Sequence, residues 1–161
     1  MKNTIKMLKD VGAKLNAPAS DDLIEKIEAQ YQIRIPSGVR ELYKEANGAN
    51  GEFGKWTWLF WPIDSEKITL SDYFKRPGKY KIADREIDPR KYLRFFDVLI
   101  DAPLYAYCAD PESKYFGEVL GVQSDDGTFD AFVSAPSAST FLALLVASKA
   151  DEAILFNENG A

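Results

Sequence analysis

The chain has 161 residues, of which 46% are hydrophobic and 28% are charged, and its net charge is −5. This length can bury a core without disulfides, and the composition is typical of globular proteins, so we expect one domain over residues 1–161. The absence of histidine and the single cysteine, Cys108, exclude Ser–His and Cys–His nucleophiles, histidine-ligated metals and an internal disulfide, which favours a binding protein over an enzyme.

The sequence shows no membrane or secretion signal. No apolar run approaches the roughly 20 residues of a membrane span. The N-terminus has lysines but lacks the apolar segment of a signal peptide. We therefore expect a cytoplasmic protein.

Three helices are predicted in the first third of the chain. Residues 4–15 have apolar residues on one side, at helical spacing. Ser20 can cap a second helix, and its first turn carries Asp21 and Asp22, where negative charge suits the helix dipole. The third helix covers residues 36–46.

The boundaries of this third helix are strongly marked. Pro36 suits a helix start, and Ser37 can accept a hydrogen bond from a free amide of the first turn. Asn47 and Gly48 easily adopt the left-handed conformation that ends a helix. The spacing of Val39, Leu42, Tyr43 and Ala46 predicts one buried stripe.

Residues 56–61 predict an aromatic strand. Trp56, Trp58 and Phe60 alternate with Thr57, Leu59 and Trp61, so the two sets face opposite ways. The tryptophans could fill the space between sheet and helices, or form a stacking surface for a ligand. The sequence leaves both interpretations open.

Residues 64–94 show little regular pattern. Basic residues alternate there with aromatic ones, as on a phosphate-binding surface. Acidic residues are interspersed, however, and the net charge of the region is only +3. We interpret it as a long solvated connection and expect no direct nucleic-acid binding.

The rest of the chain predicts an antiparallel meander and a last helix. Strands are expected at residues 95–100, 104–108, 115–122 and 129–133, with a hairpin turn at Asp126 and Gly127. A helix over residues 138–149, capped by Ser137, should pack on the sheet. The expected fold is therefore α+β: a central antiparallel sheet with N-terminal helices and a C-terminal helix packed against it.

This order of elements resembles the SUKH superfamily, the Smi/Knr cell-wall-regulator-like domains and their bacterial immunity-protein relatives. The resemblance rests on the acidic helix before Ile35 and Pro36, the helix ending in Asn47 and Gly48, and the later meander and last helix. Members usually have Leu-Pro where this chain has Ile35-Pro36. The resemblance implies a non-catalytic immunity protein that binds and neutralises a cognate toxin, often a nuclease. An intracellular scaffold or regulatory domain is the alternative.

The negative charge is concentrated in the second part of the chain. Residues 96–161 hold 11 acidic and 2 basic residues, whereas residues 1–95 hold 14 acidic and 18 basic ones. Such a field can steer a cationic partner, although it also suits simple solubility. The predicted partner-binding residues lie at strand ends and turns: Asp97, Asp101, Asp110, Glu112, Asp125 and Asp126. Neither Asp110 nor Asp125 begins a complete calcium-loop pattern, and we expect no metal.

Overall fold

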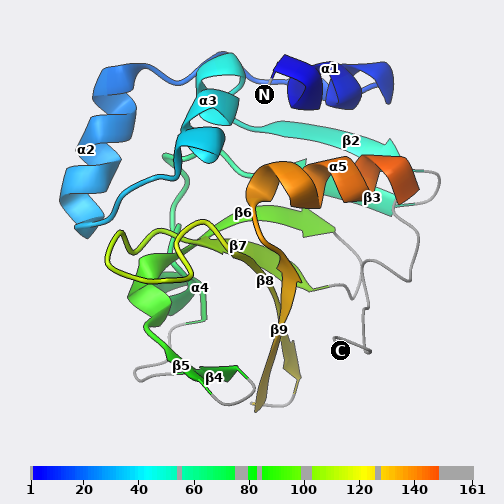
Figure 1. Cartoon of the computed structure of the whole chain (residues 1–161). Helices are drawn as coiled ribbons and strands as arrows, with labels where there is room; N and C mark the ends of the chain where they lie inside the picture. Colours follow the sequence, from blue (N-terminus) through cyan, green and yellow to red (C-terminus); the bar gives the residue numbers. More distant parts are fainter. Residues whose placement is uncertain are drawn as a thin grey trace.

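Seven antiparallel strands form one sheet in the order β1-β2-β3-β6-β7-β8-β9 (Figure 1). The computed structural model describes residues 2–53, 56–74, 80–82, 85–98, 103–125 and 128–148. The strands of this sheet are β1 (Lys14–Leu15), β2 (Ala49–Phe53), β3 (Trp56–Phe60), β6 (Tyr92–Val98), β7 (Leu104–Cys108), β8 (Val119–Asp125) and β9 (Thr128–Ala135). The helices are α1 (Lys2–Asp10), α2 (Asp21–Tyr31), α3 (Ser37–Glu45), α4 (Leu70–Phe74) and α5 (Ala138–Ser148). The α+β prediction is confirmed.

The first helix is shorter than the pattern predicted. It ends at Asp10, and Gly12 then takes a positive φ of 82°, a conformation that glycine adopts at little cost. The chain continues directly into β1, where Leu15 pairs with Ala49 of β2. The prediction of a helix up to residue 15 is therefore wrong, because Lys14 and Leu15 pair with β2 as a strand.

The caps of α2 and α3 differ from each other. The Ser20 hydroxyl accepts a hydrogen bond from the Leu23 amide at 3.1 Å, as predicted. In α3 the cap position is held by Pro36, which has no side-chain hydrogen bond, and Ser37 is already the first helical residue. The predicted capping role of Ser37 is wrong, whereas Leu42 and Tyr43 are buried as expected.

Asn47 does not end α3; its side chain joins the segment after α3 to residues 63 and 64. The helix already ends at Glu45, with an extended Ala46 after it. The Asn47 amide group accepts from the Ile63 amide at 2.8 Å and donates to Asp64 at 2.9 Å. Gly48 follows with a φ of 96°, and a Cβ there would lie 2.9 Å from the Phe60 carbonyl oxygen. Both residues are thus needed where β2 enters the sheet.

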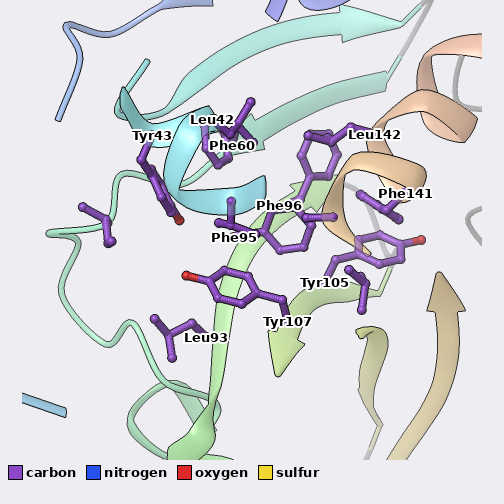
Figure 2. Packing of buried hydrophobic residues seen from close by; sticks show 14 of the residues in the cluster. Leu42, Tyr43, Phe60, Leu93, Phe95, Phe96, Tyr105, Tyr107, Phe141 and Leu142 are labelled. Carbon is purple, nitrogen blue, oxygen red and sulfur yellow. The ribbon is translucent and has the colours of Figure 1, made fainter. Parts of the chain in front are cut away.

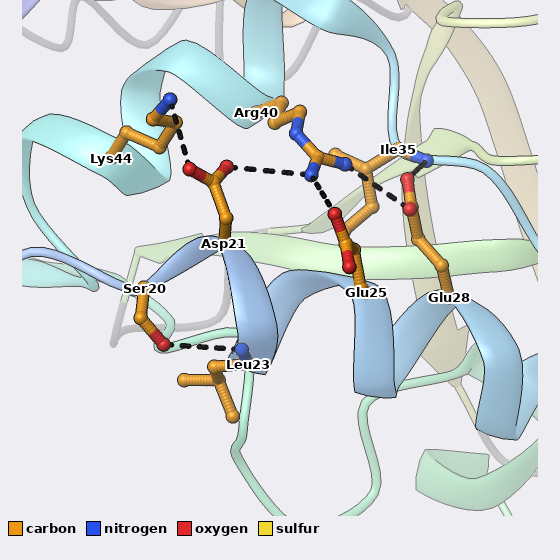
Figure 3. Close-up of polar contacts among 8 residues, drawn as sticks. All are labelled: Ser20, Asp21, Leu23, Glu25, Glu28, Ile35, Arg40 and Lys44. Carbon is orange, nitrogen blue, oxygen red and sulfur yellow. Dashed lines mark hydrogen bonds and ion pairs between the residues drawn. The ribbon is translucent and has the colours of Figure 1, made fainter.

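Polar contacts join α2 to α3 (Figure 3). The Arg40 guanidinium lies 3.1 Å from the Glu28 carboxylate, and also reaches Asp21 and Glu25 at 3.4 and 3.5 Å. The other Glu28 oxygen accepts a hydrogen bond from the Ile35 amide at 2.9 Å. Glu28 therefore holds both α3 and the segment that leads into it.

The described residues between positions 64 and 94 are more ordered than predicted. They contain α4, a small hairpin of β4 (Tyr80–Ile82) and β5 (Arg85–Ile87), a short 3-10 helix η1 (Pro89–Lys91), and the first residues of β6. Leu70 and Ile87 are buried. The prediction of a solvated connection is wrong, because apolar residues too widely spaced to show a period still meet in a core.

The main core lies between the sheet and helices α1, α2, α3 and α5 (Figures 1 and 2). The strand register shifts between Arg94 and Phe96, and Phe95 and Phe96 are both fully buried in this core. Such a bulge re-aims side chains. Phe141 of α5 packs on both rings, with centroid separations of 5.6 and 5.5 Å.

A smaller core covers part of the opposite sheet face. Leu70 of α4 and Ile87 of β5 pack there with Leu104, Ala106 and further residues of β7 and β8. This cover does not reach β2 and β3, where Asn50 and Thr57 are exposed. The sheet is therefore covered by α1, α2, α3 and α5 on one face and by a smaller cluster that spares β2 and β3 on the other.

The last strands and α5 follow the prediction closely. Residues 114–117 form a turn, so β8 begins at Val119 and not at residue 115. Asp125 pairs with Thr128, as a hairpin requires, while the predicted turn residues Asp126 and Gly127 lie outside the described residues. The Ser137 hydroxyl accepts from the Thr140 amide at 3.2 Å and caps α5, as predicted.

Candidate functional site

The aromatic segment at β3 has one buried face, which belongs to the core, and one face that is partly exposed at the surface. Trp58 and Phe60 are fully buried, and Trp58 stacks on Phe96 at a centroid separation of 5.5 Å. Thr57 is exposed, and Leu59 and Trp61 are half-buried on the other face. The aromatic residues at positions 58 and 60 are therefore core, whereas Trp61 belongs to a surface.

That surface is the part of the sheet left uncovered by helices. Residues directly opposite each other in a ladder share a face. The register pairs Lys14 with Asn50, Asn50 with Leu59, and Leu59 with Asp97, and it pairs Glu52 with Thr57. We call this surface the open sheet face: Lys14, Asn50, Glu52, Thr57, Leu59, Trp61 and Asp97.

Trp61 is held in place by a buried cation. The Arg94 guanidinium lies 3.8 Å from the centre of the Trp61 ring and 5.0 Å from that of Tyr73. It donates hydrogen bonds to the carbonyl oxygens of Lys67 and Glu66 at 2.7 and 2.6 Å. Arg94 is only 4% exposed, and desolvation lowers its pKa. Stacking on a guanidinium fixes an aromatic ring before any partner arrives.

Asp97 is the acidic residue of β6 on the open sheet face. It is half-buried, and its neighbours in register are Leu59 and Leu104. Desolvation raises the pKa of its carboxyl group, and the positive charge of Arg94 and the backbone amide of Val98 offset part of this rise. Among the described residues, no Lys or Arg forms an ion pair with it. A partner's cation would lower the remaining cost of desolvating this carboxylate.

A hollow of about 420 Å³ borders the open sheet face. It is lined by Val11, Gly12, Lys14, Asn50, Gly51, Glu52 and Thr57. It lies where β1 ends, since β1 pairs only with Ala49 and Asn50 and leaves the outer edge of the remaining β2 residues without a strand partner in the described part of the chain. An unpaired strand edge presents backbone groups that another chain can bind.

The register separates the predicted acidic residues into two groups. Asp97 pairs with Leu104, and Leu104 pairs with Val122, so Asp125 lies at the same end of the sheet as Asp97. At about 3.3 Å per residue and 4.8 Å per strand, their backbones are roughly 14 Å apart. Asp110 follows the other end of β7, about 20 Å from the Asp97 row by the same spacing.

The structure thus does not bring all six predicted residues to one rim. Asp110 and Glu112 lie together in the β7–β8 loop, where the Asp110 carboxylate accepts a hydrogen bond from the Glu112 amide at 3.1 Å. Asp97 and Asp125 are at the opposite end, and Asp101 and Asp126 lie outside the described residues. Their role in binding remains a prediction.

Basic residues border the end with Asp110. Arg34 donates its amide hydrogen to the Ala109 carbonyl at 2.9 Å, and the Lys91 side chain donates to the Gln32 carbonyl. Arg85 forms an ion pair with Glu118 and stacks 3.4 Å from the centre of the Tyr115 ring. The negative charge of Glu118 at this end is therefore compensated by Arg85.

A second hollow, of about 270 Å³, lies at this same end. Pro36 and Ser37 of the α3 start, Phe116 of the β7–β8 loop, and Pro136 and Ser137 before α5 line it. Phe116 is 38% exposed. None of its lining residues is charged, so it offers shape but little electrostatic selectivity.

In the described ranges no group of three or more His, Cys, Asp or Glu residues is placed to hold a metal ion. None of the described helices is long and apolar enough to cross a membrane.

The fold and this surface define a class of protein: an α+β domain whose antiparallel sheet is roofed by helices on one face and partly open on the other. The sequence model of the SMI1 / KNR4 family (SUKH-1) matches residues 18–144. The chain belongs to this family, which confirms the resemblance seen in the sequence. No curated protein matched the chain.

Sequence reasoning missed part of the open sheet face. The alternation at Thr57, Leu59 and Trp61 was visible, but not that this side of β3 stays uncovered. The sequence interpretation places Arg94 in a solvated connection, whereas the structure shows that Arg94 is buried against Trp61. Only the contact between β6 and residues 61–73 reveals that role.

Proposed function

We propose that this protein is an immunity protein that binds a cognate protein toxin directly and blocks it. The observation that carries the proposal is membership of the SMI1 / KNR4 family over residues 18–144. A partly uncovered sheet face with Trp61 on it supports the proposal, because Trp is among the residues that dominate protein-binding energy.

The proposed action is stoichiometric and non-catalytic. The chain has no histidine and one cysteine, and Cys108 is buried in β7. Neutralisation by binding requires no reactive group; it requires only that the bound protein covers the toxin's working surface. A scaffold function would use the same surface on a host protein.

Charge is proposed to guide the encounter. A nuclease toxin must be basic where it holds nucleic acid, and the acidic residues 97, 101, 110, 112, 125 and 126 would attract such a surface. Complementary charge raises the association rate more than the affinity, and salt screens it over about 8 Å. Cytoplasmic location follows from this function, since the toxin must be met inside the cell.

Co-expression tests the function. Toxin-type proteins encoded beside this gene are expressed in cells with and without this chain, and growth is measured. We expect growth to be restored, with a one-to-one complex in gel filtration. Toxicity unchanged by the chain, together with no complex, would refute the immunity role. A complex with a non-toxic host protein instead would favour a scaffold.

Association kinetics test the electrostatic part. Reversal of Asp110, Glu112, Asp125 and Asp126 to Lys is expected to slow association at low salt and to weaken its salt dependence. The dissociation rate should change less. An association rate equal to that of the parent at low salt would show that these residues do not steer the toxin.

A further inference from the structure

We infer that the open sheet face is the docking surface, and that its occupant is a cationic protein segment that places an Arg or Lys side chain against Asp97 and Trp61. This rests on the proposed function and goes beyond it, because it selects one end of the sheet and names the chemistry that it receives. The end with Asp110 and Glu112 is excluded as the contact site.

The Asp97 carboxylate has no ion-pair partner among the described residues. It is half-buried, and the Val98 amide and the charge of Arg94 only partly offset its desolvation. The guanidinium of Arg94 is itself committed to two carbonyl oxygens and two aromatic rings. A partner's cation would supply the missing counter-charge, and burial strengthens such a pair.

The end of the sheet with Asp97 is predominantly acidic in its described residues. The strand pairings place Glu52, Asp97, Asp125 and Asp130 at this end, and Lys14 of β1 is the basic residue on the open sheet face beside them. At the opposite end, Arg85 neutralises Glu118, and Lys114 belongs to the acidic loop itself. Charge complementarity therefore directs a cationic partner to the end with Asp97.

The open sheet face has room for a partner and is ordered before the partner binds. The 420 Å³ hollow lies beside Asn50, Glu52 and Thr57, with Lys14 on its β1 side. Trp61 is already fixed by stacking on Arg94 at 3.8 Å, so binding orders little additional structure. Leu59 lies between hollow and carboxylate in the register and provides apolar contact for the stem of an Arg or Lys side chain.

The test uses the whole chain and a defined probe, hexa-arginine amide, at low ionic strength. Binding is followed by NMR, with uncharged hexa-citrulline amide as the control peptide. We expect hexa-arginine to shift the signals of Leu59, the Trp61 indole and Asp97, and hexa-citrulline to shift none. Shifts centred on residues 110–117 would overturn the proposal.

Two matched pairs of variants locate the charge. Asp97→Asn and Asp110→Asn each remove one negative charge. Thr57→Lys and Gln30→Lys each add one positive charge at an exposed site, on the open sheet face and on α2 respectively. We expect about threefold to fivefold weaker peptide binding for Asp97→Asn and Thr57→Lys, and little change for their partners.

Equal weakening within each pair would overturn the proposal, since it would show attraction by net charge alone. Thr57→Lys keeps the test valid if Asp97→Asn does not fold, and thermal unfolding verifies both. If the protein self-associates and Thr57→Lys abolishes this, the open sheet face binds a second copy of the chain. That result would also overturn the proposal. Peptide binding at Asp97 without rescue in co-expression would refute the immunity function and leave this surface standing.

Discussion

The two faces of strand β3 arise from one alternating sequence, but one face is buried and the other is partly exposed. Trp58 and Phe60 point into the helix-covered core and are fully buried, whereas Thr57 is exposed and Leu59 and Trp61 are only half-buried. The covered face stabilises the fold through apolar area removed from water. The open face keeps apolar and charged groups together at the surface, which is the property that the proposed docking role uses. The difference shows that alternate residues of one strand can have different roles: one set stabilises the core, and the other is available at the surface.

Truncation in the covered core should give the largest effect. Leu42 is 1% exposed, so Leu42→Ala should lower the free energy of unfolding by about 2–5 kcal/mol through a lost transfer energy and a cavity. Thr57→Ala on the open face should change it by less than about 0.5 kcal/mol. Urea denaturation measures both. A midpoint unchanged by Leu42→Ala would break the contrast between the faces.

Adjacent residues of β2 sharpen the same contrast. A Cβ at Gly51 would lie 2.5 Å from the Trp58 ring, so Gly51→Ala should cost about 1–3 kcal/mol through overpacking. Asn50→Ala, one residue earlier on the open face, should change stability by less than about 0.5 kcal/mol. Thermal unfolding of both variants tests this. Equal loss in the two would mean that Asn50 is not on an open face.

The corner between α2 and α3 tests how the helical cover is held. Glu28→Ala removes the acceptor of the Ile35 amide and the partner of Arg40, which should cost about 1–2 kcal/mol in free energy of unfolding. Glu28→Gln keeps an acceptor for Ile35 and should lose less. Denaturation midpoints rank the two variants. If they are equal, the charge on Glu28 and not its hydrogen bond holds the corner.

The smallest effect, opposite in sign, is expected at Asp97. Burial raises the pKa of its carboxyl group in the folded protein, so the ionised form opposes folding above the unfolded-state value of about 3.9. Asp97→Asn should therefore raise the melting temperature at pH 7. The gain should shrink as pH falls through the raised pKa and vanish below about 3.9.

The pH series also provides the control for this prediction. Asp110→Asn should show no comparable gain, since Asp110 accepts a hydrogen bond from the Glu112 amide. If the Asp97→Asn variant were less stable than the parent at pH 7, the Asp97 carboxylate would stabilise the fold. It would then not be a group available to bind a partner.

Local patterns predicted the framework correctly where the chain is strongly periodic or punctuated. Ser20 and Ser137 cap α2 and α5, and Leu42 and Tyr43 lie in the core. The predictions failed where a distant partner decides the conformation. Leu15 pairs with β2, and Leu70 and Ile87 meet in a core although the sequence between them has no clear period.

The sequence by itself determined the α+β class, the family resemblance and the absence of histidine chemistry, because these depend on residue types and short-range spacing. Only the tertiary structure decided that Trp58 is core and Trp61 surface, and that Asp97 and Asp110 lie at opposite ends of the sheet. The physical reason is that alternation creates two faces without saying which one helices will cover. Antiparallel register, likewise, places residues by strand pairing and not by their distance along the chain.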